Sequence, residues 1–300
     1  MSKRILVPLD GSLLAETALP SAETLARLTG GQLRLISVLE MPPIFAYPEF
    51  RSEDRERAEA YLARVSEQAA GRVDGALDTV VREGHVAAEI LAEVREWNAD
   101  LIVMASHGRG GVSRLWLGSI ADRCIRHAGR PVLLVPSHPE AAGESAAPFA
   151  IRRIVVPLDG SRLAEGALEP AAELARASGS PLELLRIVSR AGIPELTTSA
   201  LSTNVHRAIM SEVHASAEKY LDETARTLGE RGITVKPRIV EGLRPSHAIL
   251  DDAGEDLIVM TTHGLSGLQR ALLGSVADQV AHGAKAPVMI LRGGPDEAES

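Results

Sequence analysis

An internal repeat governs the fold that this chain can adopt. Three segments of the first half return in the second half in the same order: Arg4–Ser12 as Arg153–Ser161, Asp100–Met104 as Asp256–Met260, and Leu117–Asp122 as Leu273–Asp278. Three separate matches in one order indicate that the chain consists of two copies of one domain. With 300 residues, the chain is long enough for two domains that each bury a hydrophobic core.

The boundary between the copies falls in a segment rich in Ala, Pro, Ser and Glu. This segment, residues 138–150, has a composition typical of a surface linker. We therefore expect the first domain at residues 1–137 and the second at residues 151–293. The remaining residues, 294–300, are polar and are expected to form a tail.

Within each copy, apolar runs of strand length alternate with helical patterns. In copy one we expect strands at 4–9, 33–39, 77–81, 101–105 and 132–135, helices at 13–28, 51–72, 86–97 and 118–127, and a proline-rich loop at 40–50. Continuous apolar strands joined by right-handed helical crossovers predict a doubly wound parallel sheet with helices on both faces. Such a sheet binds ligands beyond the carboxyl ends of its strands, where the strand order reverses.

The segment after the fourth strand combines glycines with the start of a helix. Its residues are His107, Gly108, Arg109, Gly118 and Ser119 in copy one, and His263, Gly264, Leu265, Gly274 and Ser275 in copy two. Glycines let the backbone approach an anion, and the free N–H groups and dipole of a helix start attract negative charge. The pattern favours a phosphate site, to which the serines and the arginine would add hydrogen bonds. We expect the histidines to tie the loop to the backbone, with a bond to phosphate as the alternative.

A second interpretation of the same helix starts remains open. Ser119 with Asp122, and Ser275 with Asp278, match the capping box Ser-x-x-Asp, and the glycines would then serve only the turn. The Walker pattern with its lysine is absent, and no Gly-x-Gly-x-x-Gly follows the first strand. The sequence therefore argues against a P-loop motor and a standard dehydrogenase.

The turn after the first strand supplies a carboxylate at the same edge of the sheet in both copies. Its candidate residues are Pro8, Leu9 and Asp10 in copy one, and Pro157, Leu158 and Asp159 in copy two. Each aspartate stands where a ribose hydroxyl or a metal-bound phosphate would lie, but a turn aspartate also commonly accepts hydrogen bonds from its own backbone. Both roles are open. We expect Ser12 and Ser161 to be the N-caps of the following helices.

Together these segments resemble the universal stress protein family over both halves of the chain. The ATP-binding branch of that family has a glycine, two residues, a second glycine, nine residues and then Gly-Ser or Gly-Thr. The residues that match are Gly108, Gly118 and Ser119 in copy one, and Gly264, Gly274 and Ser275 in copy two. Ala105 and Thr261 stand in place of the first glycine. The resemblance implies an α/β fold of two tandem, doubly wound, five-stranded parallel-sheet domains of the Rossmann-like or adenine nucleotide alpha hydrolase-like type, with strand order 3-2-1-4-5.

The resemblance also implies how each copy would hold ATP, with magnesium bound through the phosphates. The residues implied are Asp10 and Asp159 near the ribose, the backbone around Val38 and Ile187 against adenine, and Met104 and Met260 as walls of the pocket. We expect the methionine side chains themselves to pack in the core. Because Thr261 is β-branched and would resist a positive φ, and because Leu265 replaces Arg109, we expect copy one to bind ATP more tightly.

The implied function is a stress-response module that binds ATP in one or both domains and changes shape or partners with the nucleotide. The alternatives are a slow ATP-hydrolysing enzyme and a structural tandem with empty pockets. No general base is evident near the phosphate loop and no Ser/His/Asp constellation is present, so we expect no catalytic residue. The histidines show no metal-ligand spacing, so we expect no metal held by the protein itself.

The composition of the chain excludes some classes of binding partner. The formal net charge is −8 and only 3% of the residues are aromatic, which argues against a nucleic-acid partner. No stretch reaches the length of a membrane span and no signal peptide opens the chain, so we expect no membrane partner. The chain has a single cysteine, Cys124, which we expect to be buried and inert. Together these features lead us to expect a cytoplasmic protein. The apolar fifth strands, residues 131–135 and 287–291, would be exposed edges. We expect them to pair the halves as an intrachain pseudo-dimer, with a homodimer of two chains as a further step.

Overall fold

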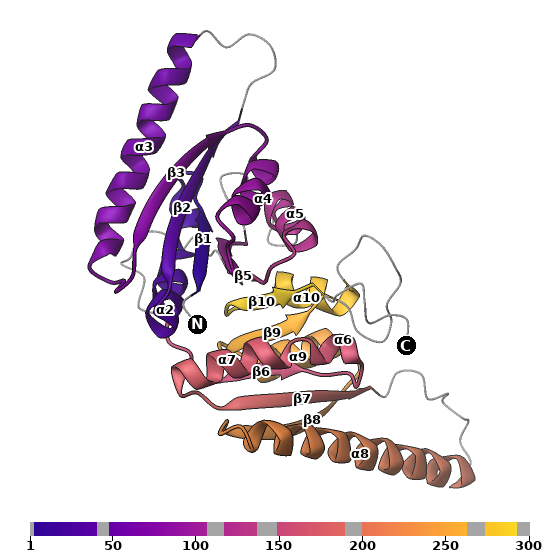
Figure 1. Ribbon diagram of the computed structural model, residues 1–300. Coiled ribbons are helices and arrows are strands. Elements are labelled where there is room, and N and C mark those ends of the chain that lie inside the picture. Colours follow the sequence, from indigo (N-terminus) through magenta and orange to yellow (C-terminus); the bar gives the residue numbers. More distant parts are fainter. Residues whose placement is uncertain are drawn as a thin grey trace. The chain divides into compact units, whose positions relative to one another are not determined.

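Figure 1 shows the computed structural model of the chain, which describes residues 3–40, 48–106, 117–136, 149–189, 200–262 and 274–292. The chain divides into two compact units. Unit 1 comprises Met1–Ala150 together with Pro287–Arg292, and unit 2 comprises Ile151–Ala286 and Gly293–Ser300. One strand from the end of the chain therefore belongs to the first unit.

Unit 1 alternates strands and helices along the chain. Its elements are β1 (Arg4–Pro8), α1 (Leu13–Glu16), α2 (Leu19–Thr29), β2 (Gln32–Leu39), α3 (Pro48–Ala70), β3 (Leu77–Glu83), α4 (Val86–Glu96), β4 (Leu101–Ala105), α5 (Ser119–His127), β5 (Val132–Val135) and β10 (Val288–Leu291). The strand order is β3-β2-β1-β4-β5, with every neighbouring pair parallel, and β10 pairs with β5 in the antiparallel sense. The predicted α/β fold and strand order are confirmed in this unit, and β10 makes its sheet mixed rather than purely parallel.

Helices cover both faces of the sheet of unit 1. α2 and α3 lie on one face, and α4 and α5 lie on the other (Figure 1). Right-handed crossovers produce this arrangement, because the chain moves outwards from β1 to β3 and then crosses back to β4. Every residue of β4 and β5 is buried, as expected for strands covered on both sides. The order of the strands reverses beside β1, so this is the point where such a sheet binds a ligand.

The predicted helix over residues 13–28 is two helices in the structure. α1 ends at Glu16 and α2 begins at Leu19, with Pro20 in its first turn. A proline has no N–H group and its ring clashes with the preceding turn, so it favours a helix start over a helix interior. The long helix α3 likewise begins at a proline, Pro48, inside the predicted loop at 40–50, of which residues 41–47 lie outside the described part. Gly30, with a φ of 58°, ends α2 in the left-handed conformation, as predicted.

Unit 2 repeats this plan. Its elements are β6 (Ile154–Pro157), α6 (Arg162–Glu165), α7 (Leu168–Ser178), β7 (Leu182–Ser189), α8 (Ala200–Gly229), β8 (Val235–Gly242), α9 (Pro245–Ala253), β9 (Leu257–Thr261) and α10 (Ser275–Gly283). The strand order β9-β6-β7-β8 is parallel throughout and repeats the order β4-β1-β2-β3 of unit 1. The internal repeat read from the sequence is therefore a repeat of structure.

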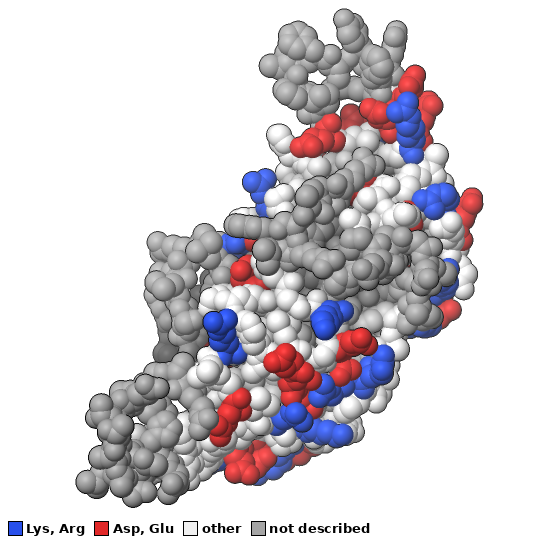
Figure 2. Space-filling view, turned by 180° about the vertical axis from the view of Figure 1, so that it is seen from behind, with Lys and Arg blue, Asp and Glu red and all other residues white. Residues whose placement is uncertain are grey.

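Acidic and basic side chains are mixed over the described surface. On the face drawn in Figure 2, red and blue side chains lie beside one another. Exposed ion pairs such as Arg57–Glu53, at 3.0 Å, join neighbours on one helix and contribute little each. Among the helices that the structure describes, none is both long enough and apolar enough to cross a membrane.

Candidate functional site

The ends of three parallel strands meet at one edge of the sheet in each unit. In unit 1, β1 lies between β2 and β4. Asp10 follows β1, Val38 lies near the end of β2, and Ala105 ends β4, so the topology brings these three predicted residues to the carboxyl edge of the sheet. The corresponding residues of unit 2 are Asp159, Ile187 and Thr261.

The turn after the first strand is held by its own aspartate. In unit 1, Asp10 Oδ1 accepts hydrogen bonds from the backbone N–H of Ser12 at 2.9 Å and from its hydroxyl at 2.6 Å. Ser12 Oγ in turn accepts from Ala15 N–H at 3.2 Å, so the predicted N-cap is confirmed. Gly11 has a φ of 82°, which any other residue would resist.

Unit 2 reproduces this turn closely. Asp159 Oδ1 accepts from Ser161 N–H at 3.0 Å and from Ser161 Oγ–H at 2.6 Å, and Gly160 has a φ of 83°. Ser161 caps α6 by accepting from Ala164 N–H at 3.1 Å. Of the two roles left open for the aspartates, the structure shows the turn role in both units, and it leaves each turn rigid at the carboxyl edge of the sheet.

The residues just before each aspartate belong to the sheet. Pro8 and Pro157 end β1 and β6 and are half-buried. Leu9 and Leu158 extend the strand ladder, each through an N–H bond of 2.8 Å to the neighbouring strand, and their side chains are buried. A ligand at this edge would therefore meet Leu9 and Leu158 through their backbone rather than their side chains.

The start of the helix after the fourth strand is tied to the end of that strand. Gly118 N–H donates to Ser106 O at 3.1 Å in unit 1, and Gly274 N–H donates to Thr262 O at 2.7 Å in unit 2. Each glycine is the N-cap of its helix, with a φ of −56°. Because glycine has no side chain, neither N-cap accepts a hydrogen bond from the first turn through a side chain. The first-turn N–H groups of α5 and α10 thus open at the same edge as the aspartate turns.

The capping-box interpretation is wrong for both helices. Ser119 is the first helical residue rather than the N-cap. Asp122, which the box would turn back towards the helix start, instead binds Arg126 one turn ahead, with Nη2 to Oδ1 at 2.7 Å. In unit 2, Ser275 also follows the cap, and the Asp278 carboxylate lies 3.7 Å from His282 Nδ1. Neither serine is therefore the N-cap of its helix, and the glycines form the turn that begins each helix.

Ala105 and Thr261, which replace a family glycine, both end buried strands. Among the described residues, Asn98 is the only non-glycine residue with a positive φ. The expectation that Thr261 would have to resist a positive φ was therefore wrong, because a strand end needs an extended backbone that suits a β-branched residue. A Cβ built on Gly166 would lie 3.6 Å from the Thr261 methyl, whereas unit 1 has Thr17 at the position of Gly166 and Ala105 at that of Thr261. The larger side chain of this pair thus follows the first strand's helix in unit 1 (Thr17) and ends the fourth strand in unit 2 (Thr261).

The other predicted site residues that the structure describes lie either in the hydrophobic core or near the strand ends. Met104 and Met260 are buried, which agrees with core packing of their side chains. Val38 and Ile187 are half-buried near the strand ends. Cys124 is buried as expected, and burial raises the pKa of its thiol to about 12, so it is inert at neutral pH.

Part of the predicted site falls outside the described residues. These positions are His107, Gly108, Arg109, His263, Gly264 and Leu265. Among the residues that are described, no group of three or more His, Cys, Asp or Glu side chains is placed to hold a metal ion.

In each unit a tyrosine of the long helix lies near the glutamate that ends the short helix after the aspartate turn, a contact that was not predicted from the sequence. Tyr220 Oη on α8 donates to Glu165 Oε1 at 2.9 Å, at the end of the helix that Ser161 caps. Burial raises the pKa of Tyr220, and the charges of Glu165 and Asp159 raise it further. Comparison of the two copies could have found this group, because a glutamate stands four residues after the capping serine in both.

Unit 1 holds the same groups in a different way. Burial and the charges of Glu16 and Asp10 raise the pKa of Tyr61 on α3. Glu16 Oε1 pairs with Arg64 Nη2 at 3.0 Å, and the Arg64 guanidinium lies 5.3 Å from the centre of the Tyr61 ring. The Tyr61 hydroxyl is buried beside Glu16, which also raises its pKa as a hydrogen-bond partner, but the contact lacks the distance and angle of a well-formed hydrogen bond.

A second missed residue is an arginine that only unit 2 has beneath its turn. Arg186 Nη1 on β7 donates to Leu158 O at 3.2 Å and lies 3.4 Å from where a Cβ on Gly160 would stand. Unit 1 has Ser37 at the matching position of β2, and that serine is buried. The turn in unit 2 therefore has a cation at a position where unit 1 has a serine.

Comparisons with known proteins agree with this architecture. The sequence profile of the Universal stress protein family matches residues 1–136 and 150–292. A universal stress protein of Mycolicibacterium smegmatis is 28% identical over 302 residues, which cover 96% of each chain. The universal stress protein Rv2005c of Mycobacterium tuberculosis is 27% identical over 304 residues, again with 96% of each chain covered.

A solved structure extends the likeness to the fold. The crystal structure of a universal stress protein from Archaeoglobus fulgidus superposes with a TM-score of 0.71 at 21% identity. The superposition covers 99% of this chain and 98% of that one. The same two-fold repetition of one domain is therefore found in a solved protein of the same length class.

Proposed function

Because this chain belongs to the universal stress protein family, we propose that it is a stress-response module that binds ATP in one or both units and changes shape or partners with the nucleotide. In this proposal the chain has no catalytic residue, and magnesium arrives with the phosphates.

The observation that carries the proposal is the geometry of the two helix starts. α5 and α10 begin at the carboxyl edge of their sheets behind glycine N-caps, which have no side chain to accept from the first N–H groups. Unsatisfied N–H groups and the positive end of the helix dipole attract an anion. Ser119 and Ser275 are exposed there, so their hydroxyls are accessible to a phosphate.

The rest of the nucleotide follows from the position of its phosphates. With the phosphates at the helix start, the ribose would lie by the turn of Asp10 or Asp159 and the adenine by the backbone of Val38 or Ile187. Rigid turns and strand ends are suited to hold a ligand without loss of conformational entropy. His107, Gly108 and Arg109, with His263 and Gly264, would complete the phosphate contacts.

Of the two reasons to expect tighter ATP binding in unit 1, one remains. Thr261 is not expected to weaken ATP binding through its backbone, because the extended end of β9 suits a β-branched residue. The replacement of Arg109 by Leu265 remains, because a guanidinium forms strong hydrogen bonds to phosphate and a leucine does not. We therefore keep the proposal that unit 1 binds ATP more tightly than unit 2.

The test is calorimetric titration of ATP with magnesium into wild type and into Ser119→Asp and Ser275→Asp variants. An acidic residue in the first turn stabilises a helix by about 0.3–1 kcal/mol, yet it occupies and repels the place of an anion. Each variant should therefore keep or gain thermal stability while its unit loses about tenfold or more in affinity for ATP.

Ser119→Asn and Ser275→Asn are the matched controls, since they have the same shape without the charge. They should retain affinity within a few-fold of wild type. If wild type binds no ATP, the chain is a structural tandem. If the aspartate variants bind as wild type does, the phosphates are not at these helix starts.

A further inference from the structure

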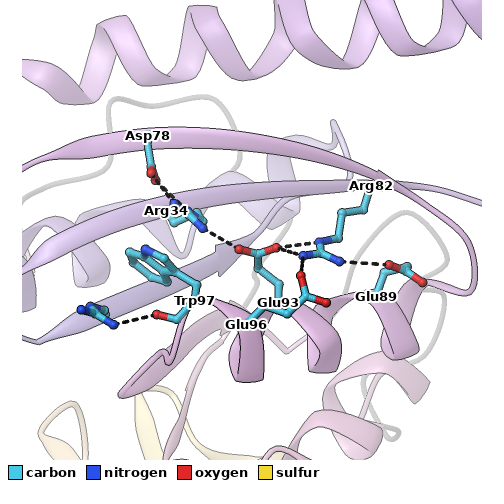
Figure 3. Close-up of polar contacts among 8 residues, drawn as sticks. Arg34, Asp78, Arg82, Glu89, Glu93, Glu96 and Trp97 are labelled. Atoms are coloured by element: carbon cyan, nitrogen blue, oxygen red, sulfur yellow. Dashed lines mark hydrogen bonds and ion pairs between the residues drawn. The ribbon is translucent and has the colours of Figure 1, made fainter.

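In unit 1 a buried glutamate on α4 lies between two arginines of the neighbouring strands (Figure 3). The Glu93 side chain is only 3% exposed. Its Oε1 accepts from Arg34 Nη1 and its Oε2 accepts from Arg82 Nε, both at 2.6 Å. Arg34 also pairs with Asp78 at 2.6 Å and lies over the ring of Trp97. Each oxygen of the buried carboxylate thus has its own cation, which offsets the loss of hydration.

Unit 2 has two acids where unit 1 has this ion pair. Glu183 and Arg34 occupy matching positions, since each stands four residues after the left-handed glycine that ends the preceding helix. Asp252 and Glu93 also match, since each stands three residues after a buried isoleucine of the next helix. The strand residue has therefore changed sign while the helix residue has remained acidic.

The two acids lie beside each other and share their arginines. Arg153 Nη1 is 2.8 Å from Glu183 Oε2 and 3.7 Å from Asp252 Oδ2. Arg238 Nε contacts Asp252 Oδ1 and lies 4.0 Å from Glu183 Oε1. The acidic side chains are 7% and 3% exposed. Their remaining oxygens, Glu183 Oε1 and Asp252 Oδ2, are closed to solvent and have no hydrogen-bond partner among the described residues.

The surrounding cations do not neutralise this group. Arg153 also binds Asp256, with Nε to Oδ2 at 2.9 Å, and Arg238 is half exposed, with 53% of its side chain accessible. Three carboxylates thus face two guanidiniums. On β7, Arg186 is half-buried and donates to Leu158 O. The following charged or titratable side chains on or beside β8 and α9 are exposed: Lys236, Glu241, Arg244, His247, Asp251 and Glu255. Two buried carboxylates in contact disfavour a state in which both are ionised.

We propose that Glu183 and Asp252 share one proton, held between Glu183 Oε1 and Asp252 Oδ2, and that this proton links α9 to β7 as a pH-sensitive contact. The shared proton gives each orphaned oxygen a partner, as buried polar groups require. The hollow beside β8 and α9, which Arg238 and Asp252 line, leaves these two oxygens covered, so a larger ligand has no route to them.

The electrostatics agree with this arrangement. Burial raises the pKa of Glu183 above its ordinary value of 4.5, and Asp252 raises it further, while Arg153 opposes the shift. The folded state therefore binds more protons than the unfolded state from about pH 4.5 up to the raised pKa of Glu183. Stability from this contact is present at low pH and is lost as the pH rises through that pKa.

The test compares the unfolding of wild type, Glu183→Gln and Asp252→Asn from about pH 5 to about pH 8. Relative to Glu183→Gln, the unfolding constant of wild type should rise by up to about tenfold per pH unit over the part of this range below the raised pKa. A glutamine amide donates a hydrogen bond to Asp252 without a titrating proton, so that variant should lose the slope. Asp252→Asn should lose it as well, and the double variant should show no further change of slope.

Glu93→Gln in unit 1 is the matched control. It breaks an ion pair rather than a shared proton, so it should lower stability across the range without removing the slope that unit 2 contributes. Parallel curves for wild type and Glu183→Gln would overturn the proposal.

A second measurement on wild type does not depend on the folding of any variant. In a carbon-13 titration with sequential assignment, the Glu183 carboxyl should titrate above 4.5. A Glu183 signal that titrates at or below that value would equally overturn the shared proton.

Discussion

At the scale of single residues, the two units use the same tyrosine and glutamate with different partners. Tyr220 donates a well-formed hydrogen bond to Glu165. In unit 1, Glu16 is paired with Arg64, and the buried Tyr61 hydroxyl beside it forms no hydrogen bond of good geometry. A buried hydroxyl with a partner stabilises a protein, and one without a partner destabilises it. The same chemical change should therefore have opposite effects in the two units.

We predict that Tyr220→Phe destabilises unit 2 by about 1 kcal/mol, while Tyr61→Phe is neutral or stabilising in unit 1. Chemical denaturation of the two variants, followed by a probe in each unit, measures both values. Equal losses in both variants would show that the two hydroxyls are bonded alike.

The exchange of bulk between Thr261 and Gly166 gives a second prediction at this scale. Gly166→Thr should destabilise unit 2, because its new side chain meets the Thr261 methyl and the Leu163 carbonyl, 3.2 Å from the Cβ position. Adding Thr261→Ala recreates the arrangement of unit 1, Thr17 with Ala105, and should recover part of the loss. We expect a coupling of about 0.5–3 kcal/mol in a double-mutant cycle, and strict additivity would contradict it.

At the scale of elements, the strands were predictable from their apolar runs, whereas the order of the sheet was implied by the family resemblance. β4 and β5 are continuous apolar runs because both faces of the sheet are covered, and the structure buries every one of their residues. The break between α1 and α2 was missed because the apolar pattern continues across it, although Pro20 marks the start of the second helix.

The positions of α5 and α10 were predictable from the sequence, but the residue that caps each helix was not. Spacing alone matched both a capping box and an anion site, and the choice depends on whether the serine or the preceding glycine is the N-cap. Gly118 and Gly274 take that place because their N–H groups bond the strand ends, a contact between residues that the sequence does not place together. The contacts of Tyr220 and Arg186 were missed for the same reason, since they join elements distant in the chain.

At the scale of the whole molecule, unit 1 includes a strand from the far end of the chain. β10 pairs with β5 through Val288 with Leu134, Met289 with Leu133 and Ile290 with Val132, which is the pairing expected of the two fifth strands. We propose that this pairing makes the chain an intrachain pseudo-dimer. Each fully buried apolar side chain of β10 contributes about 1.5–3 kcal/mol, so its loss should be severe.

A chain that ends at Ala286 lacks β10 and should expose the apolar edge of β5. We predict that it loses thermal stability and self-associates, as measured by calorimetry and light scattering. A chain that ends at Arg292 keeps every described residue and is the control. A monomeric Ala286 chain with the stability of the control would show that β10 is dispensable.

The account depends most on phosphate binding at the two helix starts. Amide NMR of wild type, titrated with ATP and magnesium, observes the first-turn N–H groups of α5 and α10 directly. We predict saturable shifts at Ser119 and Ile120, and weaker ones at Ser275 and Val276, with α9 and α4 unaffected. Saturable binding that leaves the amides of both helix starts unshifted, or no binding at all, would contradict the account.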